Sequence, residues 1–253
     1  MPIRTSDKPE ILACKGLHLF HFSTSNCSMR IRIQLAEKGI DWVDRYVDIR
    51  SQKNLTQEYF DIHPQGLVPA IIHDGLIVYE SADIMLYIEE HFPGTVSLIP
   101  ANPAAQEEMH EWLEFTRSRH VSVIKTWAYG RNRKPTKTKE SMPVFERLQK
   151  DAELLAFHRM TMSEDYIPEE KIHSAEQVLL ERFARIDAMV ADQPYMQGDR
   201  PTLADIAWIP QYALLQRNDF PFARFPNFMR WVERWKQRPS YKEGIAKWMP
   251  SAA

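Results

Sequence analysis

Hydrophobic positions in the first fifty residues change their period twice. Residues 17–22 (LHLFHF) form a short apolar and aromatic run, which is typical of a strand. Apolar residues then recur three and four positions apart until Gly39, and this spacing predicts a helix over roughly 27–38. Apolar and acidic positions alternate over 42–49, which indicates a second strand. The strand–helix–strand order implies a parallel pair at the start of a small sheet.

A β-hairpin and a further helix are predicted next. Residues 67–73 form an apolar strand and 76–79 its returning partner, with the hairpin signal Asp74-Gly75 between them. Ser81 then caps a helix that runs to about Phe92 and carries apolar residues on one face. The chain therefore begins with an α/β unit.

The remainder of the chain carries only helical periodicity. Three prolines and several small residues interrupt every pattern before residue 106, which marks a linker between domains. Thr202-Leu203-Ala204-Asp205 has the form of a capping box with Asp in place of Glu, and Pro210 should bend the helix that it opens. The predicted helices cover 107–127, 141–158, 168–191, about 202–214, 226–237 and 240–248.

These elements predict a fold of class α/β + all-α. The domain boundaries that follow are an N-terminal extension at 1–16, a sheet domain at 17–95, a linker at 96–105 and a helical domain at 106–253.

Composition excludes several classes of protein. The chain has 253 residues, 44% of them hydrophobic, and a net charge of −2, so no global field selects nucleic acid or an anionic membrane. The longest apolar runs, such as Leu67–Ile72, are too short to span a bilayer, and no secretory signal opens the chain. The two cysteines, Cys14 and Cys27, cannot build a disulfide framework, so we expect a reducing cytoplasm. No metal-binding motif occurs, and the basic segment 131–139 is expected to be a solvated loop.

Four motifs, in order and over nearly all of Leu17–Trp248, resemble those of the glutathione transferase family. They are Ser25–Arg32, Leu67-Val68-Pro69 with the turn at 73–75, Glu80-Ser81, and the segment 198–205. The first of these is most similar to the zeta-like and dehalogenase-like branches. Outside the four motifs, Trp127–Gly130 is similar to the bacterial β-aryl ether-cleaving members, the β-etherases. The resemblance implies a thioredoxin-like N-terminal domain, an all-helical C-terminal domain, glutathione as cosubstrate and a dimer.

A glutathione site follows from the same resemblance. It implies a cis Val68–Pro69 bond whose backbone pairs with the cysteine of glutathione, and a Glu80 that holds the γ-glutamyl ammonium. Ser81, at the start of a helix, would present N–H groups and the positive end of the helix dipole to the neighbouring carboxylate. Lys53 and Gln65 are further contacts for the glycyl end.

The catalytic group must favour the thiolate of glutathione. A helix dipole stabilises the thiolate by roughly 0.3–1 kcal/mol, and one hydrogen bond to a charged acceptor stabilises it by about 1.5–3 kcal/mol. The hydrogen-bond donor is therefore the larger contribution. Ser25 occupies the family's catalytic serine position, Asn26 offers an amide donor, and both also suit a helix cap. Cys27 is either a small packed residue or, as in the dehalogenase-like members, a nucleophile that forms a mixed disulfide.

The acceptor substrate is expected to bind between the helical domain and the sheet domain. An aromatic lining would suit a hydrophobic aryl compound. The predicted acceptor-site residues are His120, Lys125, Trp127, Tyr129, Phe157 and His158.

The predicted activity is glutathione-dependent cleavage of β-aryl ethers in lignin-derived aromatic ketones, in which the thiolate displaces a phenolate. The alternatives are reductive dehalogenation of a chlorinated hydroquinone through Cys27 and maleylacetoacetate-type isomerisation. A protein that retains the fold as a non-catalytic binding module is an alternative from another class.

Overall fold

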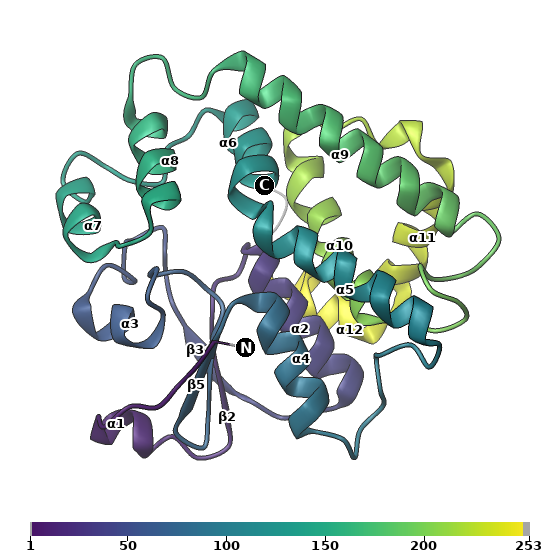
Figure 1. The fold of residues 1–253 in the computed structure, drawn as a ribbon, viewed down its shortest axis with the longest axis horizontal. Helices are drawn as coiled ribbons and strands as arrows, with labels where there is room; N and C mark the ends of the chain where they lie inside the picture. The colour runs from purple at the N-terminus through teal and green to yellow at the C-terminus, as the bar shows by residue number, and fades with distance from the viewer. Residues whose placement is uncertain (1, 250–253) are drawn as a thin grey trace.

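The computed structural model describes residues 2–249 and shows a small sheet domain beside a larger helical domain (Figure 1). The five-stranded sheet has the order β1-β5-β4-β2-β3. The pair β2 and β3 is parallel, as predicted, and the other three pairs are antiparallel. The strands are β1 (Ile3–Arg4), β2 (Leu17–His21), β3 (Val43–Tyr46), β4 (Ala70–His73) and β5 (Leu76–Tyr79).

The two faces of the sheet are covered by different helices. Leu19, Ile71 and Val78 pack in the main core with α2 and α4, which lie towards the helical domain (Figure 1). On the other face, α3 places Tyr59 against Val68 and Ile62 against the smaller cluster of Ile11, Ile72 and Ile77. The helices of this domain are α1 (Pro9–Leu12), α2 (Asn26–Lys38), α3 (Gln57–Ile62) and α4 (Ser81–His91).

The N-terminal segment joins the sheet, which the sequence pattern did not indicate. Ile3 pairs with Val78, so this segment adds an antiparallel edge strand of only two residues. Ile11 is buried against the outer face of the sheet. The short helix α3 is also absent from the prediction, because six residues give too few repeats for a period to be recognised.

The helical domain follows the predicted order with three corrections. The single helix expected over 240–248 is wrong, because α12 (Pro239–Gly244) ends at Gly244 and a separate 3₁₀ turn, η4 (Ala246–Trp248), follows it. The single helix expected over 107–127 is wrong, because a π-helical turn, η1 (His120–Lys125), separates two α-helices. The single helix expected over 141–158 is also wrong, because it breaks at Gln149 and restarts where Asp151 caps the next helix. The helices are α5 (Pro103–Ser118), α6 (Thr126–Asn132), α7 (Met142–Leu148), α8 (Ala152–Met162), α9 (Glu169–Met189), α10 (Leu203–Leu215), α11 (Pro226–Gln237) and α12 (Pro239–Gly244), with short turns η2 (Gln216–Asn218), η3 (Phe222–Arg224) and η4 (Ala246–Trp248). Within residues 2–249, none of these helices has the length and apolarity of a membrane span.

Helix α2 joins the two domains. Its Arg30 donates to the carbonyl of Ala207 in α10 at 3.1 Å, and Arg32 donates to the carbonyl of Gly244 in α12 at 2.8 Å. A Cβ atom on Gly244 would lie 2.6 Å from Ile33, so only glycine permits this close approach. Because α2 is held on both sides, the loop before it has a fixed position at the domain boundary.

Candidate active site

The N-terminus of α2 places Ser25 at the domain boundary. Ser25 is the N-cap, and its Oγ accepts a hydrogen bond from the backbone N–H of Ser28 at 3.2 Å. A hydroxyl carries one donor in addition to its acceptor lone pairs, so a capping serine still has its proton to donate. Capping and hydrogen bonding to a thiolate are therefore compatible in this half-buried side chain.

Asn26 is used differently from the expectation. Its amide Nδ2 donates to Oε1 of Gln211 in α10 at 2.8 Å, and the side chain is buried in the domain interface. This geometry gives Asn26 a structural role between the domains. One of the two Nδ2 protons of Asn26 is used in this contact.

Cys27 faces charged and polar groups of both domains. Its Sγ lies 3.7 Å from Nε2 of His120, and the side chain is half-buried. Arg30, on the next turn of α2, is fully buried, and its Nη2 has no hydrogen-bond partner within residues 2–249. The thiol therefore lies beside a buried cation and an imidazole, which is unlike the surroundings of an inert packed cysteine.

Glu80 and Ser81 lie on the other side of the same cluster. Burial raises the pKa of Glu80, the neighbouring Cys27 raises it further, and His120 and Lys125 oppose the shift. Ser81 is not the helix cap that we expected: Glu80 occupies the cap position with a φ of 68°, and Ser81 is the first helical residue. The Ser81 hydroxyl accepts a hydrogen bond from Nη1 of Arg30 at 2.9 Å.

The segment before β4 has the conformation that the family resemblance implies. The Val68–Pro69 peptide bond is cis, and Val68 is buried. The hydroxyl of Tyr59 donates to the carbonyl of Leu67 at 2.7 Å and fixes the backbone just before this bond.

The two residues predicted for the glycyl end of glutathione have different surroundings. Gln65 donates from Nε2 to Asp151 at 2.7 Å, and its carbonyl accepts from Gln149 at 2.9 Å, so it connects the sheet domain to the start of α8. Lys53 is exposed and lines an open hollow of about 220 Å³ together with Tyr59 on the outer side of the sheet domain.

The π-helical turn η1 brings two predicted acceptor residues into the cluster. His120 and Lys125, at its two ends, both influence the carboxyl of Glu80. Burial lowers the pKa of His120 well below its usual range, and the charges of Lys125 and Arg30 add to the effect, so the imidazole is neutral at pH 7. Burial also lowers the pKa of Lys125. π-helical turns are rare and frequently mark functional sites.

An aromatic cluster lies next to Lys125. The rings of Tyr129 and Phe157 meet edge to face at 5.5 Å, and Phe157 contacts His158 at 5.3 Å. Burial lowers the pKa of His158 to about 2, with Lys125 as the next largest cause. Tyr129, Phe157 and His158 thus form a continuous aromatic cluster.

Two predictions are wrong: Trp127 does not face the acceptor site, and the basic segment 131–139 is not a fully solvated loop. Trp127 points away from the site: its Nε1 donates to Glu176 at 3.1 Å, and its ring packs on Phe220 inside the helical core. The segment 131–139 is not uniformly solvated, because Lys137 is buried, with its Nζ 4.8 Å from the ring centre of Phe145. No sequence signal singles out Lys137 among its neighbouring lysines.

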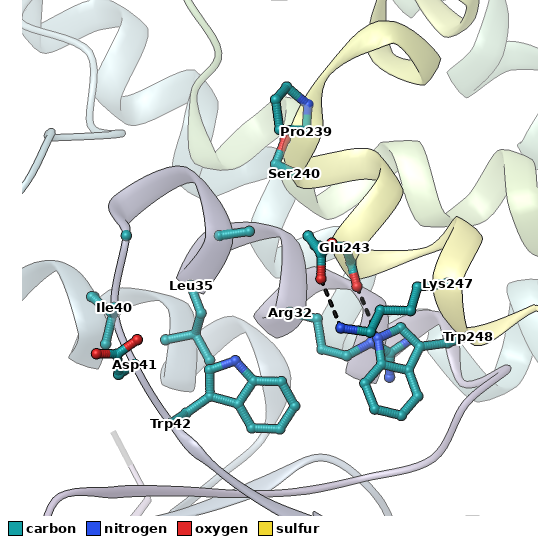
Figure 2. Close-up of a pocket in the computed structure, with 12 residues that line it drawn as sticks. Arg32, Leu35, Ile40, Asp41, Trp42, Pro239, Ser240, Glu243, Lys247 and Trp248 are labelled. Carbon is teal, nitrogen blue, oxygen red and sulfur yellow. Dashed lines mark hydrogen bonds and ion pairs between the residues drawn. The ribbon is translucent and has the colours of Figure 1, made fainter.

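A separate hollow of about 330 Å³ lies on the far side of α2, between that helix and the C-terminal turns (Figure 2). Arg32, Trp42 and Trp248 line it, and the Arg32 guanidinium lies 5.0 Å from the ring centre of Trp248. The same guanidinium donates to the carbonyls of Phe22 and Ser23 at 3.1 and 2.8 Å. These contacts hold the loop that carries Ser25. Within residues 2–249 there is no group of three His, Cys, Asp or Glu side chains that could hold a metal.

A thioredoxin-like sheet domain, a cis-proline segment and a serine-capped helix facing a helical domain together define a glutathione S-transferase. The chain belongs to this family: profiles described as the N-terminal and C-terminal domains of glutathione S-transferase match residues 19–96 and 140–239. Glutathione is the cosubstrate of the family.

Two relatives from Sphingobium resemble more than nine-tenths of the chain. The crystal structure of the β-etherase LigF from Sphingobium sp. strain SYK-6 has a TM-score of 0.77 and 26% identity, covering 91% of this chain and 99% of that one. A tetrachloro-p-hydroquinone reductive dehalogenase of Sphingobium chlorophenolicum is 27% identical over 246 residues, which are 92% of this chain and 96% of the relative. A zeta-class maleylpyruvate isomerase shares the fold, with a TM-score of 0.66 and 22% identity.

Proposed function

We propose that this glutathione transferase cleaves β-aryl ethers of aromatic ketones. The observation that carries the proposal is Lys125, a half-buried lysine at the end of η1 whose side chain interacts electrostatically with Cys27, Glu80 and His158. A phenolate that leaves during ether cleavage is an anion in an aromatic environment. A fixed cation at that point stabilises the developing charge, and burial strengthens the interaction. The similarity to LigF over more than nine-tenths of the chain supports the same substrate class.

The proposed reaction is a single displacement. The thiolate of glutathione attacks the carbon that carries the aryloxy group beside the ketone, and a carbon–sulfur bond forms. The carbon–oxygen bond breaks, and the phenolate leaves with the electron pair beside Lys125. In this proposal Ser25 donates its hydroxyl proton in a hydrogen bond to the thiolate and keeps the sulfur in line with the carbon.

Three groups would hold the tripeptide. Glu80 binds the γ-glutamyl ammonium, the first N–H groups of α4 at Ser81 bind the adjacent carboxylate, and the backbone of Val68 pairs with the cysteinyl residue. Burial makes ionised Glu80 costly in the free protein, so a bound ammonium would compensate its negative charge.

A turnover assay tests the activity directly. The protein is incubated with glutathione and either an aryl-ether ketone, a chlorinated hydroquinone or maleylacetoacetate, and the products are identified by mass. We expect a free phenol and a glutathione thioether from the first compound. Turnover of none of the three, with retained binding to glutathione resin, would contradict catalysis and favour a binding module.

Replacing Ser25 by alanine should lower kcat for ether cleavage by about 10- to 100-fold, because one hydrogen bond to a charged acceptor is lost. Ser25→Thr keeps both the hydroxyl and the cap and should retain most of the activity. Ser23→Ala is the matched control, since Ser23 lies in the same turn and its side-chain hydroxyl accepts from the Tyr46 hydroxyl at 3.3 Å. Equal kcat values for Ser25→Ala and Ser23→Ala would contradict the role of Ser25.

The pH dependence of glutathione binding should reveal the ionisation of the Glu80 carboxyl. Its pKa is raised by burial, so the carboxylate is lost on acidification at a higher pH than for an exposed glutamate. We therefore expect kcat/KM for glutathione to fall as pH decreases towards that raised pKa. Glu80→Gln should reduce kcat/KM by about tenfold at neutral pH and remove this limb of the profile. Glu90→Gln, an exposed change on the same helix, should leave the profile unaltered.

A second candidate function is favoured by the contact between Cys27 and His120 at 3.7 Å. In reductive dehalogenation, glutathione first replaces chloride on the ring. The sulfur of Cys27 then attacks the sulfur of that adduct, the ring carbon takes the electron pair and a proton, and a mixed disulfide remains. A second glutathione releases Cys27 as the thiol and leaves as glutathione disulfide, so two glutathione molecules supply the two electrons.

A further inference from the structure

Three basic side chains from three separate segments of the helical domain converge beside the aromatic cluster. Lys125 comes from η1, Lys137 from the loop between α6 and α7, and His158 from α8. Lys137 Nζ lies 4.8 Å from the ring centre of Phe145, and the same ring meets His158 edge to face at 4.9 Å. Lys125 is close enough to act electrostatically on both other groups.

Two of these side chains, Lys137 and His158, are buried next to aromatic rings. Lys137 is only 7% exposed, and its Nζ lies against the ring of Phe145. His158 is 5% exposed, and its buried Nδ1 has no hydrogen-bond partner within residues 2–249. Burial of a charged group is costly unless it is paired, and burial of an imidazole nitrogen without a hydrogen bond adds to that cost. An anion bound between the two would satisfy both groups.

The segment that carries Lys137 is held in place from both domains. Gln52 of the sheet domain donates to the carbonyl of Thr136 at 2.7 Å, and Tyr129 of α6 hydrogen-bonds to Thr136. Lys137 is thereby directed towards Phe145 instead of solvent. A lysine that only increased solubility would need no such anchoring, and the exposed Lys134 and Lys139 on the same segment have none of these contacts.

The rings around the cluster define the rest of the ligand. Phe145 and Phe157 contact His158, Phe145 also contacts Lys137, and Tyr129 packs on Phe157, so a ligand that reaches these groups presents an aromatic ring together with its charge. A carboxylate accepts hydrogen bonds from a lysine ammonium and from an imidazole N–H. The helical domain supplies all of these groups, whereas the proposed contacts for glutathione come from the sheet domain and the start of α4.

We propose that Lys137 and His158 form a carboxylate-binding subsite for an acceptor that carries an aromatic acid group. This rests on the proposed function in one respect, which is that the acceptor binds against the helical domain. Lys125 acts electrostatically on His158 of the subsite and on Cys27 at the start of α2. The subsite therefore holds the acidic end of the acceptor while the bond that breaks remains beside Lys125.

Binding of benzoate by the glutathione-saturated protein tests this subsite without requiring turnover. Isothermal titration should show that benzoate binds at least about tenfold more tightly than benzamide, which has the same ring and no charge. Lys137→Met should remove this preference, and Lys137→Arg should restore most of it. Lys134→Met is the matched control, because this exposed lysine lies three positions away, and it should bind benzoate like the unmodified protein.

Other outcomes would overturn the proposal. Equal binding of benzoate and benzamide by the unmodified protein would show that no carboxylate subsite exists, even if Lys137→Met failed to fold. A Lys137→Met protein with normal benzoate binding but a raised KM for glutathione would assign the cation to glutathione instead of the acceptor. Since benzoate binding is measured without an ether substrate, failure of the subsite and failure of ether cleavage are distinguishable.

Discussion

Alanine at position 27 is expected to abolish reductive dehalogenation of a chlorinated hydroquinone while ether cleavage continues close to its original rate. Dehalogenation needs the Cys27 sulfur to take glutathione from the ring, and loss of a nucleophile costs at least about a thousandfold in rate. Ether cleavage ends when the phenolate leaves and has no step that uses Cys27. In the unmodified protein the Sγ of Cys27 lies 3.7 Å from His120 Nε2.

The measurement compares both reactions for the unmodified protein, Cys27→Ala and Cys27→Ser. Serine matches the size of cysteine and should behave as alanine does in dehalogenation, because a hydroxyl cannot form the mixed disulfide. Mass spectrometry of the unmodified protein after a single turnover should find glutathione attached at Cys27 and not at Cys14. Loss of ether cleavage in Cys27→Ala would transfer the principal role from Ser25 to Cys27.

Local signals in the sequence were sufficient to predict the hairpin turn and the helix cap near the active site. The Asp74-Gly75 pair predicts a tight hairpin, and both residues adopt positive φ angles of 49° and 85° in the observed turn. Ser25 caps α2 as its residue type and position predict. These features depend on neighbours within a few positions along the chain, which a single sequence displays.

The relative directions of the His120 and Lys125 side chains depend on the change from an α-helix to a π-helical turn. In an α-helix, residues five apart lie about 140° from each other around the axis and point in different directions. A π-helical turn, with hydrogen bonds between residues five apart, brings them to similar directions. In the observed turn, His120 and Lys125 lie at the two ends, and both act electrostatically on the carboxyl of Glu80. No hydrophobic period in this stretch indicates such a turn.

Other parts of the site depend on contacts that are distant in sequence. Asn26 is engaged by Gln211, and Lys137 is buried because Gln52 holds the carbonyl of Thr136. The separations in sequence are 185 and 84 residues. From residue type alone, Asn26 is a candidate donor to the thiolate, and Lys137 is expected to be solvated. The contacts with Gln211 and Gln52 cannot be recognised from spacing in the sequence.

The capping motif of α10 is the part of the helical domain that sequence described most fully. Thr202 and Asp205 form the predicted capping box, and Asp205 is fully buried. Its Oδ2 accepts from the Thr202 N–H and hydroxyl, both at 3.0 Å. Its Oδ1 accepts from the N–H of Met196 and from Nε1 of Trp231, both at 2.9 Å. One carboxylate thus satisfies four donors and joins α10 to α11 and to the preceding loop.

Asp205→Ala should therefore lower the free energy of unfolding by about 3–5 kcal/mol, because it removes a buried charged acceptor and leaves buried donors unpaired. Burial alone raises the pKa of Asp205, whereas its four hydrogen bonds act in the opposite direction, so the carboxylate depends on those donors. Urea unfolding followed by tryptophan fluorescence measures the change. Asp199→Ala, an exposed aspartate in the same loop, should change stability by no more than about 0.5 kcal/mol. Similar midpoints for both variants would show that the domain core, and not this network, fixes the start of α10.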